Sequence, residues 1–474
     1  MRAGTFLRGC ARLRRRTHLL ALGCSLAFGG CSSFVSPPVD EAQVQGFAAE
    51  LALNLAEAAP RISGPVSIDD AVSRAVNLNQ RIRSAQFEAE IADWQIRIQR
   101  GELLPDVIAD SGYVRRNKLP YSRSSQSAIY STSSQLSTVT HNLDMSLNIL
   151  DMGLTLVRMR QAGDEANIKH EAVRRVSIDI ARETRAVYWR AVALRVLVPR
   201  WKVIAPKVSE VLSLSQLAVL DAALDPLNFI NFQKDLLNSR RELNDLLAQI
   251  AGAELQLKEL ISVAPDSDLQ FTSKRRVDSL DLPQGPPADD VPLALMNRPE
   301  VRQRLYDLRI TEQEVSAAVL SVLPGAVLTQ SLRQDSTSYL LHADWSSFAA
   351  RATLNLMNLV RLPERLELIE RQKDFNRQRA VELAAAVGTQ VHVARWRLAA
   401  QLSLYKDAEE FHRSQKALLQ QVRNSIRAGR LPEQMAAREE LATLLAEVRA
   451  ILAFGDVNAA YGDYLAAIGV IPLQ

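Results

Sequence analysis

The chain has 474 residues, of which 47% are hydrophobic and 23% charged, a composition that belongs to folded proteins and excludes a disordered chain. The excess of basic residues lies in residues 1–30, which contain six arginines and no acidic residue. Removing these six from the 57 basic residues leaves 51 against 53 acidic residues, so the remainder is almost neutral. The basic pI therefore does not indicate nucleic acid as a partner.

Residues 1–30 have the charge pattern and length of a secretory signal peptide. The arginines come first, an apolar run begins at Leu19, and two glycines lead to Cys31. The sequence of residues 28–31 resembles the cleavage box of bacterial lipoproteins, which would leave a lipid on Cys31. A rival box ends at Cys24 and would leave a shorter apolar run.

The cysteines restrict the chemistry of the mature chain. All three lie in the leader or at its end, so a chain cut before Cys31 has one cysteine and neither a disulfide nor a cysteine metal site. Ser32 follows, and resemblance to bacterial lipoproteins then implies sorting to the outer membrane. Residues 31–65 are expected to form a lipid-anchored linker.

The rest of the chain is duplicated. The two repeats are predicted at 66–262 and 289–474, joined by a proline-containing linker at 263–288. The matches run in order with a slowly shrinking offset, which indicates one element order given twice. At an offset of 219, residues 75–82 match 294–301, and Leu104-Pro105 matches Leu323-Pro324; at 207, residues 147–150 match 354–357, and Trp189-Arg190 matches Trp396-Arg397; at 206, Pro226 matches Pro432.

Each repeat is expected to begin with a helix, at 68–103 and 289–322, because apolar residues recur with a helical period until a proline ends the pattern. Strands then alternate apolar and polar residues, as Leu143, Met145 and Leu147 do. The four strands are predicted at 105–115, 142–152, 324–334 and 348–358.

Polar loops join the strands of each pair. Residues 121–140 contain eleven serines and threonines, and 335–347 is a shorter copy. Two interpretations stay open for these hairpins, a membrane hairpin and a soluble hairpin with a solvated loop. Two aromatic pairs are candidates either for a girdle at the membrane interface or for loop packing, namely Tyr113 with Tyr121 and Trp345 with Phe348.

Long helices follow the strands. Residues 164–198 and 389–428 contain neither glycine nor proline, and with flanking segments each predicts a helix of about 60 residues. Returning helices are expected at 227–251 and 433–454. Helices of this length favour coiled packing against neighbours. Trp189 and Trp396, at matched positions, are expected to pack in the core.

The number of strands implies an oligomer if they cross a membrane. Strands in lipid must close into a barrel, because an open edge leaves backbone groups without partners. One chain supplies four strands, whereas the smallest usual barrel has about eight. The protomers must then associate.

This order of elements resembles the TolC family of outer-membrane efflux proteins over residues 66–474. The matching signatures are 68–79, which opens the first repeat, Leu103-Leu104-Pro105 before the first strand, 148–153 at the strand-to-helix junction, 426–429 at a helix tip, and 461–469 near the end. The resemblance implies a mainly α fold with a small pair of membrane β-hairpins. It also implies a homotrimer with a 12-stranded barrel and an α-helical periplasmic tunnel, a periplasmic adaptor and an inner-membrane pump.

The same resemblance assigns two groups of site residues. The helix tips would dock the adaptor, and the start of the last helix would hold a periplasmic gate. Family channels can place carboxylates in the gate, where this chain has Met435 and Arg438; a ring of Arg438 would favour anions, and an outward-facing Arg438 is the alternative. The tip residues are Asp225, Pro226, Arg427, Gly429, Arg430 and Pro432, and the gate candidates are Glu433, Met435, Arg438 and Glu439.

No catalytic motif is present in the sequence. The histidines after the leader are scattered and have no metal-binding spacing, and the chain has no phosphate-binding or nucleophile-elbow glycine motif. We therefore expect no enzyme, no metal and no cofactor beyond the lipid on Cys31. The rival interpretation is a periplasmic helical scaffold or adhesin lipoprotein without a pore.

Overall fold

A computed structural model describes residues 38–57, 62, 64–123, 129–220, 226–275 and 277–471. The chain divides into two units, residues 1–60 and 61–474. The described part of the first unit is one helix, α2 (Glu41–Glu57), whose start is capped because the Gln43 backbone N–H donates to Asp40 Oδ1 at 2.7 Å. The signal peptide and Cys31 lie outside the described residues. Among the described helices, none has the length and hydrophobicity needed to cross a membrane.

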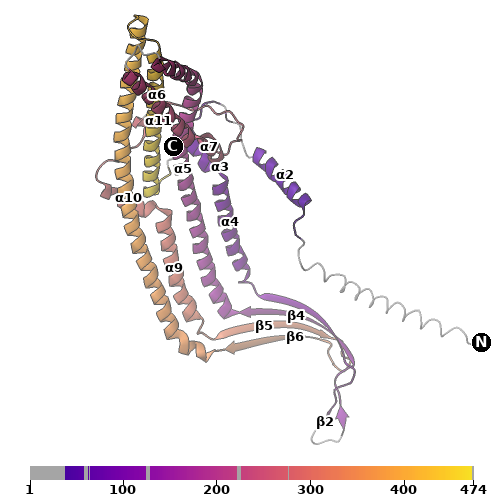
Figure 1. Ribbon diagram of the computed structural model, residues 1–474. Helices are drawn as coiled ribbons and strands as arrows, with labels where there is room; N and C mark the ends of the chain where they lie inside the picture. Colours follow the sequence, from indigo (N-terminus) through magenta and orange to yellow (C-terminus); the bar gives the residue numbers. More distant parts are fainter. Residues whose placement is uncertain are drawn as a thin grey trace, which may run out of the picture. The chain divides into compact units, whose positions relative to one another are not determined.

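The second unit contains the same order of elements twice (Figure 1). In the first half a helix pair is followed by two long strands, a very long helix and a returning helix. The second half repeats this order. The first half consists of α3 (Ile68–Leu78), α4 (Gln80–Gly101), β1 (Asp106–Arg115), β4 (Ser137–Asn148), α5 (Ile149–Leu220), α6 (Pro226–Ile250) and α7 (Ala253–Leu260); the second consists of α8 (Asp290–Asn297), α9 (Pro299–Leu320), β5 (Gly325–Asp335), β6 (Asp344–Thr353), α10 (Leu356–Arg427) and α11 (Gln434–Ile468).

Shorter elements fill the connections. Strands β2 (Ser122–Arg123) and β3 (Tyr130–Ser131) pair with each other between β1 and β4. Two 3-10 turns, η1 (Val277–Ser279) and η2 (Pro287–Asp289), lie between the halves.

The two halves agree in length as well as in order. Helices α4 and α9 each have 22 residues and lie 219 positions apart in the sequence, and α5 and α10 each have 72 residues and lie 207 apart. Every position on one of these helices therefore has a defined counterpart on the other.

The first helix of each half is divided, where the sequence predicted one continuous helix. The break falls at Asn79 and Arg298, which are counterparts at the offset of 219 and have extended backbone. Asn79 is buried, and its side chain accepts from the Arg81 backbone N–H and donates to the Leu260 carbonyl. This cap starts α4 afresh and ties it to α7.

The predicted strands 142–152 and 348–358 extend too far. Residues 149–152 and 356–358 are helical, because the preceding asparagines cap the long helices. Asn148 Oδ1 accepts from the Leu150 backbone N–H at 3.2 Å, and Asn355 Oδ1 accepts from the Met357 N–H at 3.1 Å. Each strand therefore passes directly into a 72-residue helix, longer than expected.

The core lies where α11 packs on α5 and α10. Trp189 packs edge-on against Phe454 with ring centres 4.6 Å apart, and against Tyr188 at 5.4 Å. The Tyr188 hydroxyl donates to the carbonyls of Val66 and Thr272, at 2.8 and 3.1 Å, so the segments that flank both halves meet at this ring.

Trp396 does not share this environment, and the expectation that it packs in the core was wrong. Its residue is 76% exposed, whereas Trp189 is 3% exposed. Among the described elements, α5 packs against α3, α4, α6 and α7 as well as α9 and α11, whereas α10 packs against α8, α9 and α11 and leaves Trp396 uncovered.

The four long strands form one antiparallel sheet in the order β1-β4-β5-β6. Within the second unit, Figure 1 places this sheet at one end of the long helices and the turn between α10 and α11 at the other. Strands β1 and β6 form the two edges.

Two glycine substitutions test the packing of α11 on α5. A Cβ on Gly455 would lie 2.8 Å from the Trp189 Cβ, so we expect Gly455→Ala to cost about 1–3 kcal/mol through overpacking. Gly163→Ala is the matched control, because no atom lies within 4 Å of its added Cβ and the helix gains about 1 kcal/mol. Thermal unfolding followed by circular dichroism should show a lower Tm for the first variant only; equal shifts would contradict this packing.

Candidate functional site: the two-faced sheet and the helix tip

The sheet has one mainly polar and one mainly apolar face, and the strand register assigns each residue to a face. Side chains directly opposite in neighbouring strands point to the same side of a sheet. Asp144 lies opposite Ile108 and Ser331, and Leu143 lies opposite Ala109 and Leu332. The polar face contains Asp106, Asp110, Asn142, Asp144, Ser146, Thr329, Ser331, Arg333 and Arg351, and the apolar face contains Val107, Tyr113, Val139, Leu143, Met145, Leu328, Leu332, Phe348 and Ala350.

The apolar face is open to its surroundings. Along β4 the exposure alternates, and Leu143 and Met145 are exposed while Asn142 and Asp144 are partly covered. Phe348 on β6 is 69% exposed. A row of exposed apolar side chains on a sheet is unusual for a soluble protein and typical of a surface that contacts lipid or a partner.

The register also divides the aromatic candidates. Tyr113 and Phe348 lie on the apolar face, as girdle residues must. Trp345 lies opposite Arg333 and therefore on the polar face. Tyr121 lies outside the four-stranded sheet, next to β2.

The turn after α10 has the expected geometry at Gly429. Its φ of 67° is left-handed, its N–H donates to the Ile426 carbonyl at 2.9 Å, and the Arg430 N–H donates to the Ser425 carbonyl at 2.9 Å. These two bonds close a Schellman motif, which favours glycine because a Cβ strains this conformation.

The tip residues form an exposed group in this turn. Arg427, Gly429, Arg430 and Pro432 are all exposed. At the tip of the first half, Asp225 lies outside the described residues, and Pro226 is the first residue of α6. Adaptor docking at these residues stays a prediction.

The gate candidates lie at the start of α11 and differ in their surroundings. Glu433 is exposed, Met435 is half-buried, and Glu439 accepts from the Gln415 side chain at 2.7 Å. Arg438 Nη2 lies 3.1 Å from Asp235 Oδ2, and its guanidinium lies over the Phe232 ring. Arg438 therefore faces α6, where Asp235 balances its charge, and the gate assignment stays a prediction.

Glu440 is a functional candidate that the sequence analysis missed. Its carboxylate accepts from Lys207 on α5 at 3.0 Å and from Arg423 on α10 at 2.8 Å, so it joins three helices near the tip. Burial raises the pKa of Glu440, but the two cationic donors outweigh this and hold its pKa below the ordinary value of 4.5. The sequence has no signal for it, because its partners are 233 and 17 positions away.

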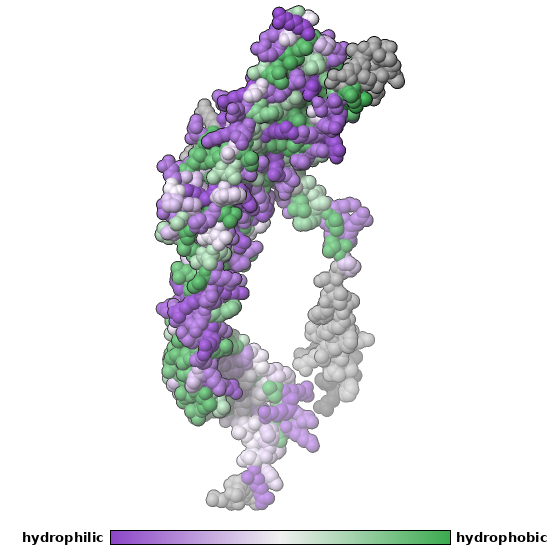
Figure 2. Space-filling model, turned by 60° about the vertical axis from the view of Figure 1, so that its left-hand side comes forward, coloured by the Kyte–Doolittle hydropathy of each residue, from purple (hydrophilic) through white to green (hydrophobic). Residues whose placement is uncertain are grey.

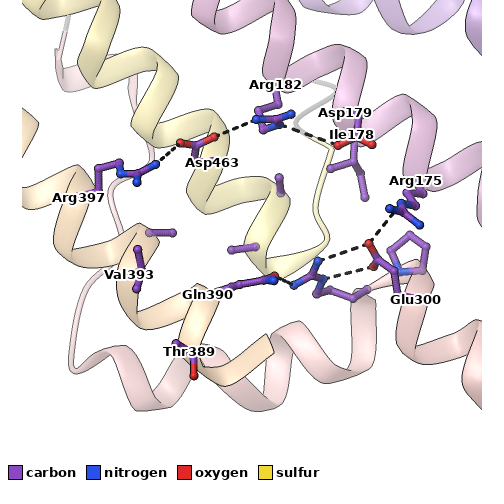
Figure 3. Close-up of a pocket in the computed structure, with 15 residues that line it drawn as sticks. Arg175, Ile178, Asp179, Arg182, Glu300, Thr389, Gln390, Val393, Arg397 and Asp463 are labelled. Atoms are coloured by element: carbon purple, nitrogen blue, oxygen red, sulfur yellow. Dashed lines mark hydrogen bonds and ion pairs between the residues drawn. The ribbon is translucent and has the colours of Figure 1, made fainter. Parts of the chain in front are cut away.

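A second group of charges lines a surface cavity of about 450 Å³ between α5, α9, α10 and α11 (Figure 3). Asp463 on α11 lies 3.5 Å from Arg182 and 3.3 Å from Arg397, and Glu300 lies near Arg298 and Arg175 at 3.3 and 3.7 Å. The ion pairs link all four helices, so the cavity is a junction of the helical frame. In the described part of the chain, no group of histidine, cysteine and carboxylate side chains is placed to hold a metal ion.

The fold is similar to that of solved outer-membrane channels. No protein-family model matches the chain, and no curated protein matches it. The Campylobacter jejuni outer membrane channel CmeC is similar with a TM-score of 0.67 and 16% identity over 85% of each chain. The outer-membrane channel OprN has a TM-score of 0.63 and 15% identity over 85% of this chain and 89% of its own, and the Neisseria gonorrhoeae channel MtrE, in its open state, has 0.60 and 17% over 86% and 89%. The expected fold class is thereby confirmed.

The pH dependence of stability tests the role of Glu440. Because its pKa is lowered in the folded protein, its stabilisation is present above pH 4.5 and is lost as the pH falls through the folded pKa. We expect Glu440→Gln to lower the free energy of unfolding by about 1–2 kcal/mol at pH 7, with the difference closing at a pH well below 4.5. Thermal unfolding at both pH values measures this. Glu410→Gln, at an exposed position on α10, is the control that should leave Tm unchanged.

Proposed function

We propose that this protein is the outer-membrane channel component of a tripartite efflux or type I export system. It would pass substrate from a pump and an adaptor across the periplasm and the outer membrane, without catalysis. The observation that carries the proposal is the four-stranded sheet with one apolar face, one polar face and two open edges.

The strand lengths support a membrane position for the sheet. The four strands have 10, 12, 11 and 10 residues, and a tilted strand needs about 9–11 residues to cross the hydrocarbon core. The apolar face would contact lipid, and the polar face would line the pore. Since edges β1 and β6 cannot stay unpaired in lipid, several copies must close one barrel. Three copies would supply 12 strands, the homotrimer that the resemblance implies.

The helices support a conduit on the other side of the sheet. A helix of 72 residues is about 110 Å long, which suits a path through the periplasm. The exposed turn at Gly429 lies at the far end and would dock the periplasmic adaptor, through which the inner-membrane pump would act. The start of α11, from Glu433 to Glu439, would form the gate.

A periplasmic scaffold or adhesin lipoprotein is the second candidate, and one observation separates the two. A soluble hairpin would bury its apolar face under other elements, whereas Phe348, Leu143 and Met145 are exposed. Figure 2 shows apolar and hydrophilic side chains intermixed along the helices.

Electrical recording tests the channel. We expect the purified protein in a planar lipid bilayer to give discrete openings, because a closed barrel encloses an aqueous path. Before purification, we expect the protein to stay with the outer membrane in a carbonate wash. We expect detergent to then extract it as an oligomer. A protein that is soluble without detergent and gives no openings would contradict the proposal.

Metabolic labelling tests the lipid anchor, which would attach the protein to the outer membrane in addition to the barrel. We expect Cys31→Ser to abolish incorporation of labelled palmitate, because no other cysteine would remain in the mature chain. Cys24→Ser is the matched control and should label normally. If Cys24→Ser abolished labelling and Cys31→Ser did not, the lipidated cysteine would be Cys24.

A further inference from the structure

The helices beside the sheet form a row with two open sides. Their order is α4-α5-α9-α10, with α9 packed on both α5 and α10 (Figure 1). Helix α4 thus lies at one edge of the row and α10 at the other. Strands β1 and β6, which join α4 and α10 directly, are the edges of the sheet on the same two sides.

Both outer helices carry exposed apolar side chains. On α4, Phe87, Ile91, Trp94 and Ile98 are between 53% and 66% exposed, and their spacing of four, three and four residues places them on one face. On α10, Leu368 and Phe375 are 57% and 56% exposed and are separated by two helical turns. No described element of the chain covers either stripe, although such a face is normally covered.

The duplication identifies what would cover these stripes. Since α4 is the counterpart of α9 and α10 is the counterpart of α5, the packing of α9 on α5 has a counterpart in the packing of α4 on α10. One chain cannot make this contact, because its α4 and α10 lie at opposite edges of the row. Two copies of the chain can.

The ion pair at the centre of the α5–α9 contact supports this. Asp164 on α5 is 2% exposed and lies 3.0 Å from Arg309 on α9, and it also accepts from the Gln313 side chain at 2.9 Å. At the offset of 207 the counterpart of Asp164 is Arg371, and at 219 the counterpart of Arg309 is Glu90. Both charges are reversed, so the pair stays complementary.

A second pair is reversed in the same way. Arg175 on α5 lies 3.7 Å from Glu300 on α9, and their counterparts are Glu382 on α10 and Arg81 on α4. Arg81 pairs with Glu183 in its own chain at 2.9 Å, so Glu382 would join an existing pair. Two of the three described ion pairs between α5 and α9 thus exchange sign together, which fits one register between α4 and α10. The third, Arg302–Glu171, has the counterparts Arg83 and Gln378.

We propose that α10 of one copy packs on α4 of the next copy in the register of the α5–α9 contact, with ion pairs Glu90–Arg371 and Arg81–Glu382 between copies. In this register Trp94, the counterpart of Gln313, lies beside Arg371, and Ile91 packs on Leu368. Within its own chain Trp94 carries the Arg97 guanidinium over its ring at 4.3 Å, and Arg371 pairs with Glu367 at 2.9 Å. The contact is head-to-tail, so each copy uses one edge for each neighbour, and copies related by a closing rotation form a ring. The inference rests on the proposed function, because it assigns the contacts of the proposed oligomer.

The reversed pair gives a charge-exchange test in the full-length protein. We expect Glu90→Arg or Arg371→Glu alone to weaken the oligomer on the order of tenfold, measured by size-exclusion chromatography with light scattering in detergent. The double variant should restore assembly to within about twofold of the unaltered protein. Glu88→Arg is the matched control on α4; Glu88 pairs with Lys169 of its own chain, so Arg371→Glu should not rescue it.

Disulfide trapping gives a second readout that does not depend on weakened assembly. Gln161 lies beside the Ile310 carbonyl at 3.5 Å, and the counterparts of these two residues are Leu368 and Ile91. We expect Ile91→Cys with Leu368→Cys to give oxidised ladders of linked chains, whereas Ile91→Cys with Leu418→Cys should not. If the unaltered protein assembles and conducts but neither rescue nor linkage occurs, this register is wrong and the channel stands; an unaltered protein that stays monomeric and does not conduct would overturn both.

Discussion

The structure depends on one constraint, which is that the apolar side chains along two 72-residue helices must be covered by neighbouring helices. A helix of that length cannot bury its own apolar residues, and its stability comes from the helices packed beside it. Helix α5 has α4 on one side and α9 and α11 on the others, and Trp189 lies in the centre of that cover. Among the described elements, α10 packs against α8, α9 and α11 but has no long helix in the place that α4 takes beside α5, and Trp396 is exposed. The packing of the long helices is therefore incomplete within one chain.

The same incompleteness appears in the sheet. A soluble sheet protects its edges and its apolar face within one chain, whereas here β1, β6 and the face of Leu143 and Phe348 are all open. The sheet and the helical row are open on the same two sides because each outer strand is continuous with an outer helix. An assembly that completes one therefore completes the other.

Much of this architecture can be predicted from the sequence, because alternation and duplication are local patterns. The alternation of apolar and polar residues at Leu143–Leu147 predicts which side chains lie on each face of β4. The offsets of 219 and 207 predict which helix of one half corresponds to which helix of the other. The strand ends were wrong because Asn148 and Asn355 act as caps, and a cap is recognised by a hydrogen bond rather than by hydrophobicity. Glu440 and Trp396 could not be assigned, because the partners of Glu440 are distant in sequence and a face left without cover has no local signature.

The unequal hairpins have a consequence for how such a protein can change. The offset between the halves falls from 219 to 207 within the connection between strands, so the connection after β5 is shorter than the connection after β1. The register of the strands on either side is unaffected by this loss. The length of these connections is therefore independent of the geometry of the wall, since loop length adds little to the free energy of closing a hairpin. Segments at this end can change in length and sequence while the wall beneath them keeps its dimensions.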